Sequence, residues 1–132
     1  MILKPYSNDE SILAEMQFHD EGHKARYVSY LQRMGKNDSE RAAFAYLIAL
    51  TNAPINDCYD FELDEIKPEA VDCSWATGTD ARVLALAFNL FNCFYYTADV
   101  SDVFSYPDWE YVQYMFFAIR IRFCCTRFYL AK

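Results

Sequence analysis

The stretch DSERAAFAYLIALTN, residues 38–52, is the strongest indication of the fold, because its positions from Ala42 to Leu50 are all apolar or aromatic. A helix that is apolar on every face has to be covered by other elements on most sides. Asp38 stands where a helix N-cap is expected, and Pro54 stands where the helix should end. The sequence therefore predicts a buried helix at the centre of the molecule.

A second stretch, TDARVLALAFNLFNCF, repeats this design. Thr79 is its expected N-cap, Arg82 is its last charged residue, and Asn89 is the polar exception in the apolar run that follows. Two such helices, over 38–51 and 79–93, can form the hub of a helical bundle. The core residues expected from these helices are Phe44, Leu47, Leu84 and Phe88.

Helices are also predicted around this hub. Apolar residues at three- and four-residue steps predict an amphipathic helix over 20–34, which Gly35 should end, and a shorter helix is expected over 9–17. A last helix is expected over 107–123, with Pro107 in its first turn. The apolar stripe by which we expect it to pack on the hub is Trp109, Val112, Phe116, Ile119 and Phe123.

Between the hub helices, aromatic and apolar residues alternate with acids over 58–67, which predicts a short strand or a β-hairpin. Pro68 should begin a single helical turn. The predicted fold is mainly α, a compact bundle of four to five helices with this small β element. Residues 1–132 are about the length of one domain, so we expect a single helical domain.

The net charge of −7 is concentrated in 57–80, where eight acids stand against Lys67 alone. Such a chain repels phosphate, so we expect no direct nucleic-acid binding and favour a basic protein as partner. No stretch approaches the ~20 apolar residues of a membrane span, and the N-terminus turns polar too soon for a signal peptide. We therefore expect a cytoplasmic protein without membrane contact.

His19 and His23 stand four residues apart, a spacing that can chelate one zinc ion on a helix. In H-E-x-x-H the glutamate directly follows the first histidine, whereas here Asp20 holds that place and Glu21 comes one residue late. A helix start with two half-exposed histidines explains the same residues. We therefore expect no cofactor, and keep a small zinc-dependent hydrolase that uses His19 and His23 as the alternative.

Other enzyme chemistry has little support. The glycines form no G-x-G-x-x-G, P-loop or G-x-S-x-G motif, and the acids of 58–67 miss the glycine and the glutamate of a calcium loop. Five cysteines without a C-x-x-C pair predict reduced, mostly buried thiols, with a redox role of Cys124 and Cys125 left open. A small-molecule pocket in the aromatic core remains a further alternative.

A non-enzymatic protein-binding domain is the favoured function, because aromatic and acidic residues are plentiful. Charge steers an encounter and aromatic burial holds it. Some aromatics could equally be core or allow a homodimer. The residues that we expect to contact a partner are Asp60, Glu62, Asp64 and Glu65 of the acidic stretch, and Tyr111, Tyr114 and Phe117 of the last helix.

The strings FHDEGHKARYVSYL, YDFELDEIKPEA, ARVLALAFNLFN and AIRIRF, within 18–123, resemble a small family of uncharacterised proteins of Gram-positive bacteria and their phages. The resemblance implies a shared fold and brings no catalytic residues. It also implies a phage or mobile-element accessory protein, and such proteins often block a host protein such as a CRISPR effector.

Overall fold

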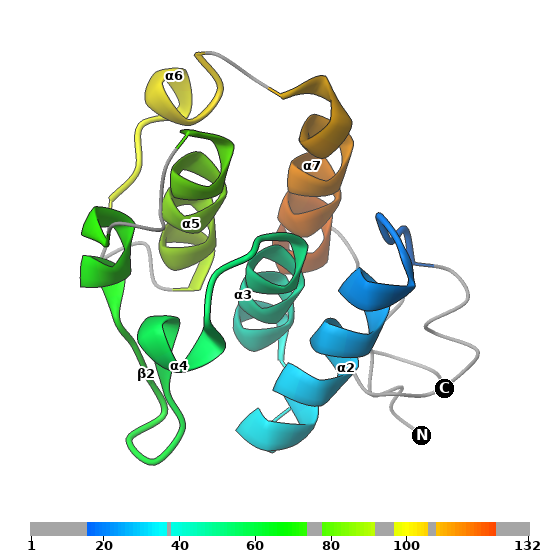
Figure 1. Cartoon of the computed structure of the whole chain (residues 1–132), viewed down its shortest axis with the longest axis vertical. Helices are drawn as coiled ribbons and strands as arrows, with labels where there is room; N and C mark the ends of the chain where they lie inside the picture. The colour runs from blue at the N-terminus through cyan, green and yellow to red at the C-terminus, as the bar shows by residue number, and fades with distance from the viewer. Residues whose placement is uncertain (1–15, 37, 74–77, 92–96, 106–107, 124–132) are drawn as a thin grey trace.

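The computed structural model describes residues 16–36, 38–73, 78–91, 97–105 and 108–123. Within these ranges the fold is mainly α with one small hairpin, as predicted (Figure 1). The four helices of 12 to 15 residues are α2 (Glu21–Met34), α3 (Ser39–Leu50), α5 (Gly78–Phe91) and α7 (Trp109–Phe123). The short elements are α4 (Ile55–Cys58), β1 (Tyr59–Asp60), β2 (Glu65–Ile66), the 3-10 helix η1 (Pro68–Asp72) and α6 (Val100–Val103).

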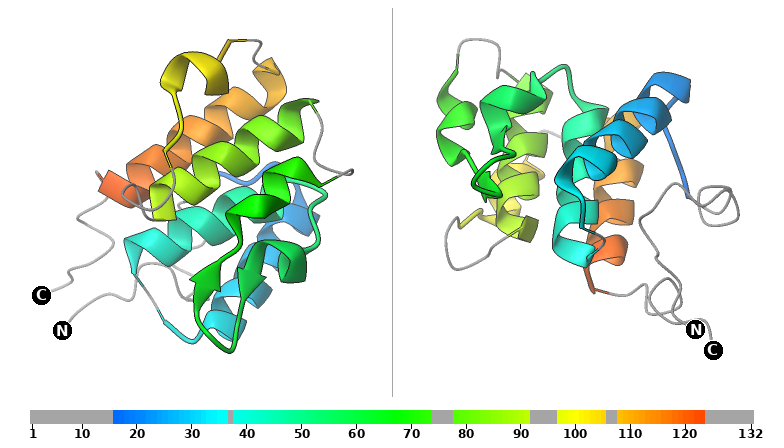
Figure 2. Two further views of the ribbon diagram at one scale, coloured as in Figure 1. Left: turned by 90° about the vertical axis from the view of Figure 1, so that its left-hand side faces the viewer. Right: turned by 90° about the horizontal axis from the view of Figure 1, so that it is seen from below.

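Helix α3 is the centre of the molecule, packed against α2, α5 and α7 (Figures 1 and 2). Every residue from Ala42 to Leu50 is buried, which confirms the predicted central helix. Asp38 is the N-cap, with its carboxylate accepting the backbone N–H of Arg41 at 2.9 Å. The helix ends within the predicted range, at Leu50 with Thr51 as its C-cap, a few residues before Pro54. The backbone N–H and the hydroxyl of Thr51 both bond to the carbonyl of Ile48.

Helix α5 supplies the other half of the hub. The four predicted core residues, two on α3 and two on α5, are fully buried, and the rings of Phe44 and Phe88 lie 5.6 Å apart. Thr79 is not the N-cap, because the helix already begins at Gly78. The hub predicted from the two apolar runs is thus confirmed, with a start one residue earlier.

Helix α2 begins one residue later than the sequence predicts and ends where it predicts. Asp20 is its N-cap, and the left-handed Gly35 (φ 71°) donates its backbone N–H to the carbonyl of Leu31 at 3.0 Å. A residue with a side chain would be strained at that φ, so glycine suits the position. Of the helix expected over 9–17, positions 9–15 lie outside the described residues, and 16–17 are not helical.

The small β element is an antiparallel hairpin in which Tyr59 pairs with Ile66 and Asp60 with Glu65. Its strands are two residues each, shorter than the predicted alternation. The turn between them carries Leu63, which is 65% exposed. Pro68 begins η1, as predicted.

The predicted core stripe of α7 is right at Val112, which is buried, and at Ile119, which is partly buried against the core, and it is wrong at its three aromatic residues. Trp109, Phe116 and Phe123 are exposed, and the buried face consists of Val112, Met115, Phe117, Ala118 and Ile121. The helix is apolar around most of its circumference, so periodicity could not decide which face meets α3. Among the described residues, no helix has the length and apolarity needed to span a membrane.

Candidate protein-interaction surface

The outer face of α7 exposes three large aromatic side chains. Trp109 is 79% exposed, Phe116 53% and Phe123 61%. Their seven-residue spacing is close to two helical turns, so they form a line along the helix. At a rise of 1.5 Å per residue, that line is about 21 Å long. We call these three residues the aromatic line.

A groove of about 350 Å³ lies beside the aromatic line, between α7 and α6. Phe104 stacks on Phe116 with ring centroids 5.3 Å apart, and Val100, 73% exposed, adds to its apolar wall. Asn89 is the one polar residue among those that line it. The complete lining is Leu86, Asn89, Ala98, Val100, Val103, Phe104, Phe116 and Ile119.

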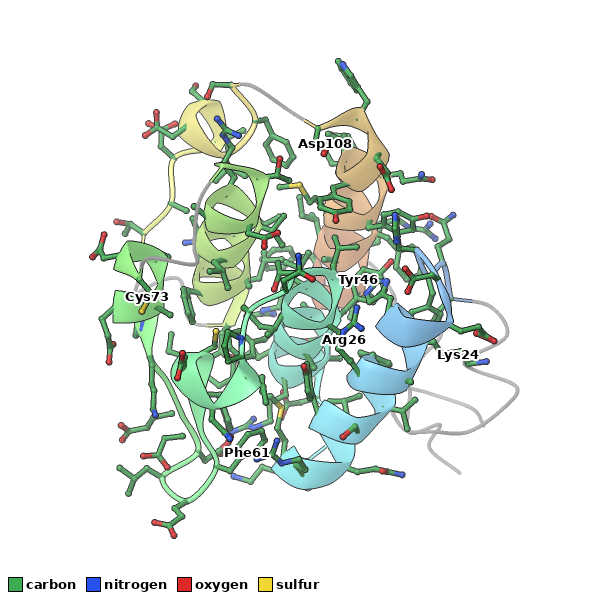
Figure 3. All side chains as sticks on the ribbon, viewed as in Figure 1. Lys24, Arg26, Tyr46, Phe61, Cys73 and Asp108 are labelled. Atoms are coloured by element: carbon green, nitrogen blue, oxygen red, sulfur yellow. The ribbon has the colours of Figure 1, made fainter. Side chains whose placement is uncertain are left out.

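Charges of opposite sign lie at the two ends of α7. Asp108 is exposed at the start of the helix (Figure 3), where its carboxylate caps the backbone N–H of Glu110 at 3.0 Å. Arg120 is exposed near the other end, and Arg122 donates to the carbonyl of Leu90 at 2.8 Å. The surface is therefore apolar along its length, acidic at one end and basic at the other.

His23 lies on the opposite side of α7, in the core, with both ring nitrogens engaged. Nδ1 accepts the backbone N–H of His19 at 3.0 Å, and Nε2 lies 2.8 Å from the carbonyl of Tyr46, to which it donates. Burial lowers the pKa of His23 to about 4. The ring is thus neutral at pH 7, and neither nitrogen is open to a metal.

His19 has the opposite environment. Nδ1 lies 2.9 Å from the carboxylate of Asp20, Nε2 bonds to the carboxylate of Glu110, and these bonds raise its pKa. Its ring also meets those of Tyr111 and Tyr114 edge-on, at 5.5 and 5.6 Å between centroids. His19, just before α2, is thus bonded to α7 through the carboxylate of Glu110.

The two histidines therefore do not converge on one point, although they are four residues apart. Across the described residues, no group of three or more His, Cys, Asp or Glu side chains could hold a metal ion. The thiols of Cys124 and Cys125 lie outside those residues. Burial raises the pKa of Cys58 to about 12, so that thiol is unreactive at pH 7.

The four acids of the hairpin do not form one strand face. Asp60 accepts the backbone N–H groups of Glu62 and Leu63 at 2.9 and 3.0 Å, and so shapes the turn. Asp64 forms ion pairs with Lys36, at 2.8 Å, and with Arg41. Glu62 and Glu65 remain exposed. Two of the four acids thus have structural roles, Asp60 in the turn and Asp64 in ion pairs with cations from other parts of the fold.

Tyr111, Tyr114 and Phe117 do not form the exposed surface that the sequence predicts. Phe117 is buried with its ring 5.5 Å from that of Tyr46, which extends from α3 (Figure 3). The two tyrosines are half-buried and pack against the core. The exposed aromatic residues of α7 are therefore the three that the sequence predicted as core, and their seven-residue spacing is the signal that relates them.

Residues 13–131 match the model of one protein family, described as Family of unknown function (DUF6075). No match was found among curated proteins. None was found among solved structures.

Proposed function

We propose that this chain, which belongs to the family of unknown function DUF6075, is a non-enzymatic protein-binding domain. The proposed contact surface is the outer face of α7 with the adjoining groove. The observation that carries this proposal is the aromatic line, in which Trp109, Phe116 and Phe123 are each more than half exposed. Exposed apolar surface that is continuous over two elements is typical of interaction sites.

The composition of the surface supports a protein rather than a small molecule as the ligand. Tryptophan and phenylalanine are enriched at protein interfaces, where a few large side chains supply most of the binding free energy. A small-molecule site usually adds several converging polar groups to its apolar wall, and its volume is about 300–1,000 Å³. The groove, at about 350 Å³, is near the lower limit and has Asn89 as its only polar lining residue.

The charge of the chain favours a basic partner. Glu62 and Glu65 project from the hairpin, and Glu69 and Asp72 are exposed on η1, on the side of the molecule away from α7 (Figure 1). Together with the net charge of −7, these acids would speed the encounter with a cationic protein surface. The resemblance to proteins of Gram-positive bacteria and their phages extends the proposal to an accessory protein that blocks a nucleic-acid-binding host effector, of CRISPR type or otherwise.

Affinity capture from a lysate of a Gram-positive bacterium, with quantitative mass spectrometry, tests the proposal. Phe116→Glu places a charge in the middle of the aromatic line, and Leu63→Glu is the matched control at an equally exposed apolar position on the hairpin. We expect proteins captured by the wild type and by Leu63→Glu to be lost with Phe116→Glu. Equal capture by all three baits would contradict the proposal.

A second arm tests the charge. Glu62→Lys with Glu65→Lys leaves the structural acids Asp60 and Asp64 in place. The association rate with a captured partner should fall at low salt and fall less at high salt, because salt screens surface charges beyond about 10 Å at 0.1 M. An unchanged rate at low salt would exclude the basic-partner assignment while leaving the outer face of α7 as the contact.

A further inference from the structure

The outer face of α7 has the residue spacing of a helix–helix seam. Trp109, Phe116 and Phe123 repeat every seven residues, and the partly buried Ile119 stands beside them, whereas Val112 is buried in the core. A seven-residue repeat is that of one heptad position, whose side chains insert between those of a parallel or antiparallel neighbour. No described element lies over the aromatic line, since its residues are 53–79% exposed.

The polar residues beside the aromatic line indicate the direction of a partner helix. Gln113 and Arg120 are both exposed and stand seven residues apart, so they lie on the same side of the aromatic line. In a parallel pair, opposite flanks face each other, so Gln113 would lie beside the acidic Asp108 of the second copy. In an antiparallel pair, the same flanks face each other with the sequence reversed, so Arg120 would face Gln113, and the basic end of one helix would lie beside the acidic Asp108 of the other.

We propose that a second copy of this chain covers the outer face of α7, antiparallel to it about a two-fold axis near Phe116. The inference rests on the proposed function, and it identifies a second copy of the chain as a partner of the α7 surface. A two-fold interface uses the same patch on both subunits. When two copies of α7 lie antiparallel, the acidic end of each helix lies beside the basic end of the other. The line is also near-symmetric, with an aromatic residue at its centre and one at each end.

The groove on each subunit can accept a side chain of the other subunit. Its wall of Val100, Phe104 and Ile119 is apolar and partly open, and an aromatic side chain from the reversed helix can enter it. The hairpin lies across α3 and α5 from this face (Figure 2), so the dimer would leave its acids accessible to a basic protein. One chain can thus contact a copy of itself through α7 and another protein through the hairpin side.

Sedimentation equilibrium of the purified protein over a wide concentration range tests the association. We expect the wild type and the Leu63→Glu control to be dimers, and Phe116→Glu, whose charge is introduced twice at the two-fold axis, to dissociate with a Kd raised by about a hundredfold or more. Circular dichroism checks that each variant is folded. A folded wild type that is monomeric at all concentrations overturns the inference.

Charge variants at Gln113 test the orientation. In the antiparallel pair, Gln113→Glu gains two contacts with Arg120 of the second copy and should lower the Kd about two- to tenfold, whereas Gln113→Arg should raise it by a similar factor. A parallel pair would place position 113 beside Asp108 of the second copy, so Gln113→Glu would raise the Kd and Gln113→Arg would lower it. That result, or no change with either variant, overturns the antiparallel arrangement.

Different results would contradict the proposed protein-binding function and the proposed self-association. A monomeric wild type whose capture of other proteins is still lost with Phe116→Glu overturns the second copy as occupant and retains the outer face of α7 as a contact for a different protein. A dimer that captures the same proteins whether or not Phe116 is replaced supports the self-association and removes the face as the site for other partners.

Discussion

At the scale of single residues, His19 and His23 show how position within the fold changes the chemistry of one residue type. Four residues apart, they are a possible chelate by spacing alone. The structure buries His23 with both ring nitrogens bonded and leaves His19 between the carboxylates of Asp20 and Glu110. The sequence could not predict this, because Tyr46 and Glu110 come from elements distant in the chain.

His23 makes the stability of the fold depend on pH. Its pKa is about 4 in the folded chain and about 6.5 in an unfolded one, so the unfolded state takes up the proton first as the pH falls. The stabilisation is complete above pH 6.5 and is lost as the pH falls towards 4, by about 2–3 kcal/mol at pH 4.5. Urea unfolding at pH 7 and 4.5 measures this loss.

His23→Gln should flatten that pH dependence, although it lowers the stability at pH 7. His19→Gln is the control of opposite sign. The raised pKa of His19 stabilises the fold below pH 6.5, and this contribution disappears as the pH rises through the folded pKa. A wild type whose unfolding free energy is the same at pH 7 and 4.5 would contradict the assignment of His23 as a buried neutral ring.

Two buried tyrosines offer a second test at this scale. Within the described part of the chain, the hydroxyls of Tyr27 and Tyr59 have no hydrogen-bond partner, whereas that of Tyr46 donates to the carbonyl of Gln17. A buried polar group without a partner costs about 1–3 kcal/mol. Tyr27→Phe should therefore raise the free energy of unfolding by about 1 kcal/mol, and Tyr46→Phe should lower it by a similar amount. Thermal and urea unfolding measure both changes. A lower free energy of unfolding for Tyr27→Phe would show that the Tyr27 hydroxyl is hydrogen-bonded.

At the scale of elements, the sequence was most informative where caps and periodicity agree. Helix α3 starts after Asp38 as predicted, because the acidic N-cap and the apolar pattern indicate the same residue, and α2 starts one residue later than predicted, with Asp20 as its N-cap. The sequence was least informative for α7. Apolar residues lie around most of the circumference of this helix, so their spacing does not single out the face that packs on the core. Which face meets α3 depends on the shape of the space left between α2 and α5.

The two faces of α7 should respond differently to truncation. Ile121 is fully buried, so Ile121→Ala should cost about 2–5 kcal/mol of stability. Phe116→Ala, on the outer face, should cost less than about 1 kcal/mol in the monomer, because that side chain is already half in water. Urea unfolding at a concentration below dimer formation measures both. A larger loss with Phe116→Ala would restore the stripe predicted from the sequence.

At the scale of the whole molecule, α3 and its neighbours separate two surfaces of different chemistry. The aromatic line and its groove lie on α6 and α7, while the exposed acids Glu62 and Glu65 lie on the hairpin; Figure 3 places Asp108 and Phe61 at opposite ends of the view. Composition predicted that both kinds of surface exist. It could not place them, because Lys36 and Arg41 neutralise part of the acidic stretch only once the chain is folded.

The accessibility of Trp109 tests the central claim, that the outer face of α7 is a protein contact, most directly. In a Trp75→Phe variant, Trp109 is the only tryptophan, and acrylamide quenching reports how much of it is in water. Because the side chain is 79% exposed in the single chain, we expect strong quenching at high dilution and protection as the protein concentration rises, with the midpoint shifted to higher concentration by Phe116→Glu. Quenching that stays equally strong at every concentration, and when a captured partner is added, would contradict the claim.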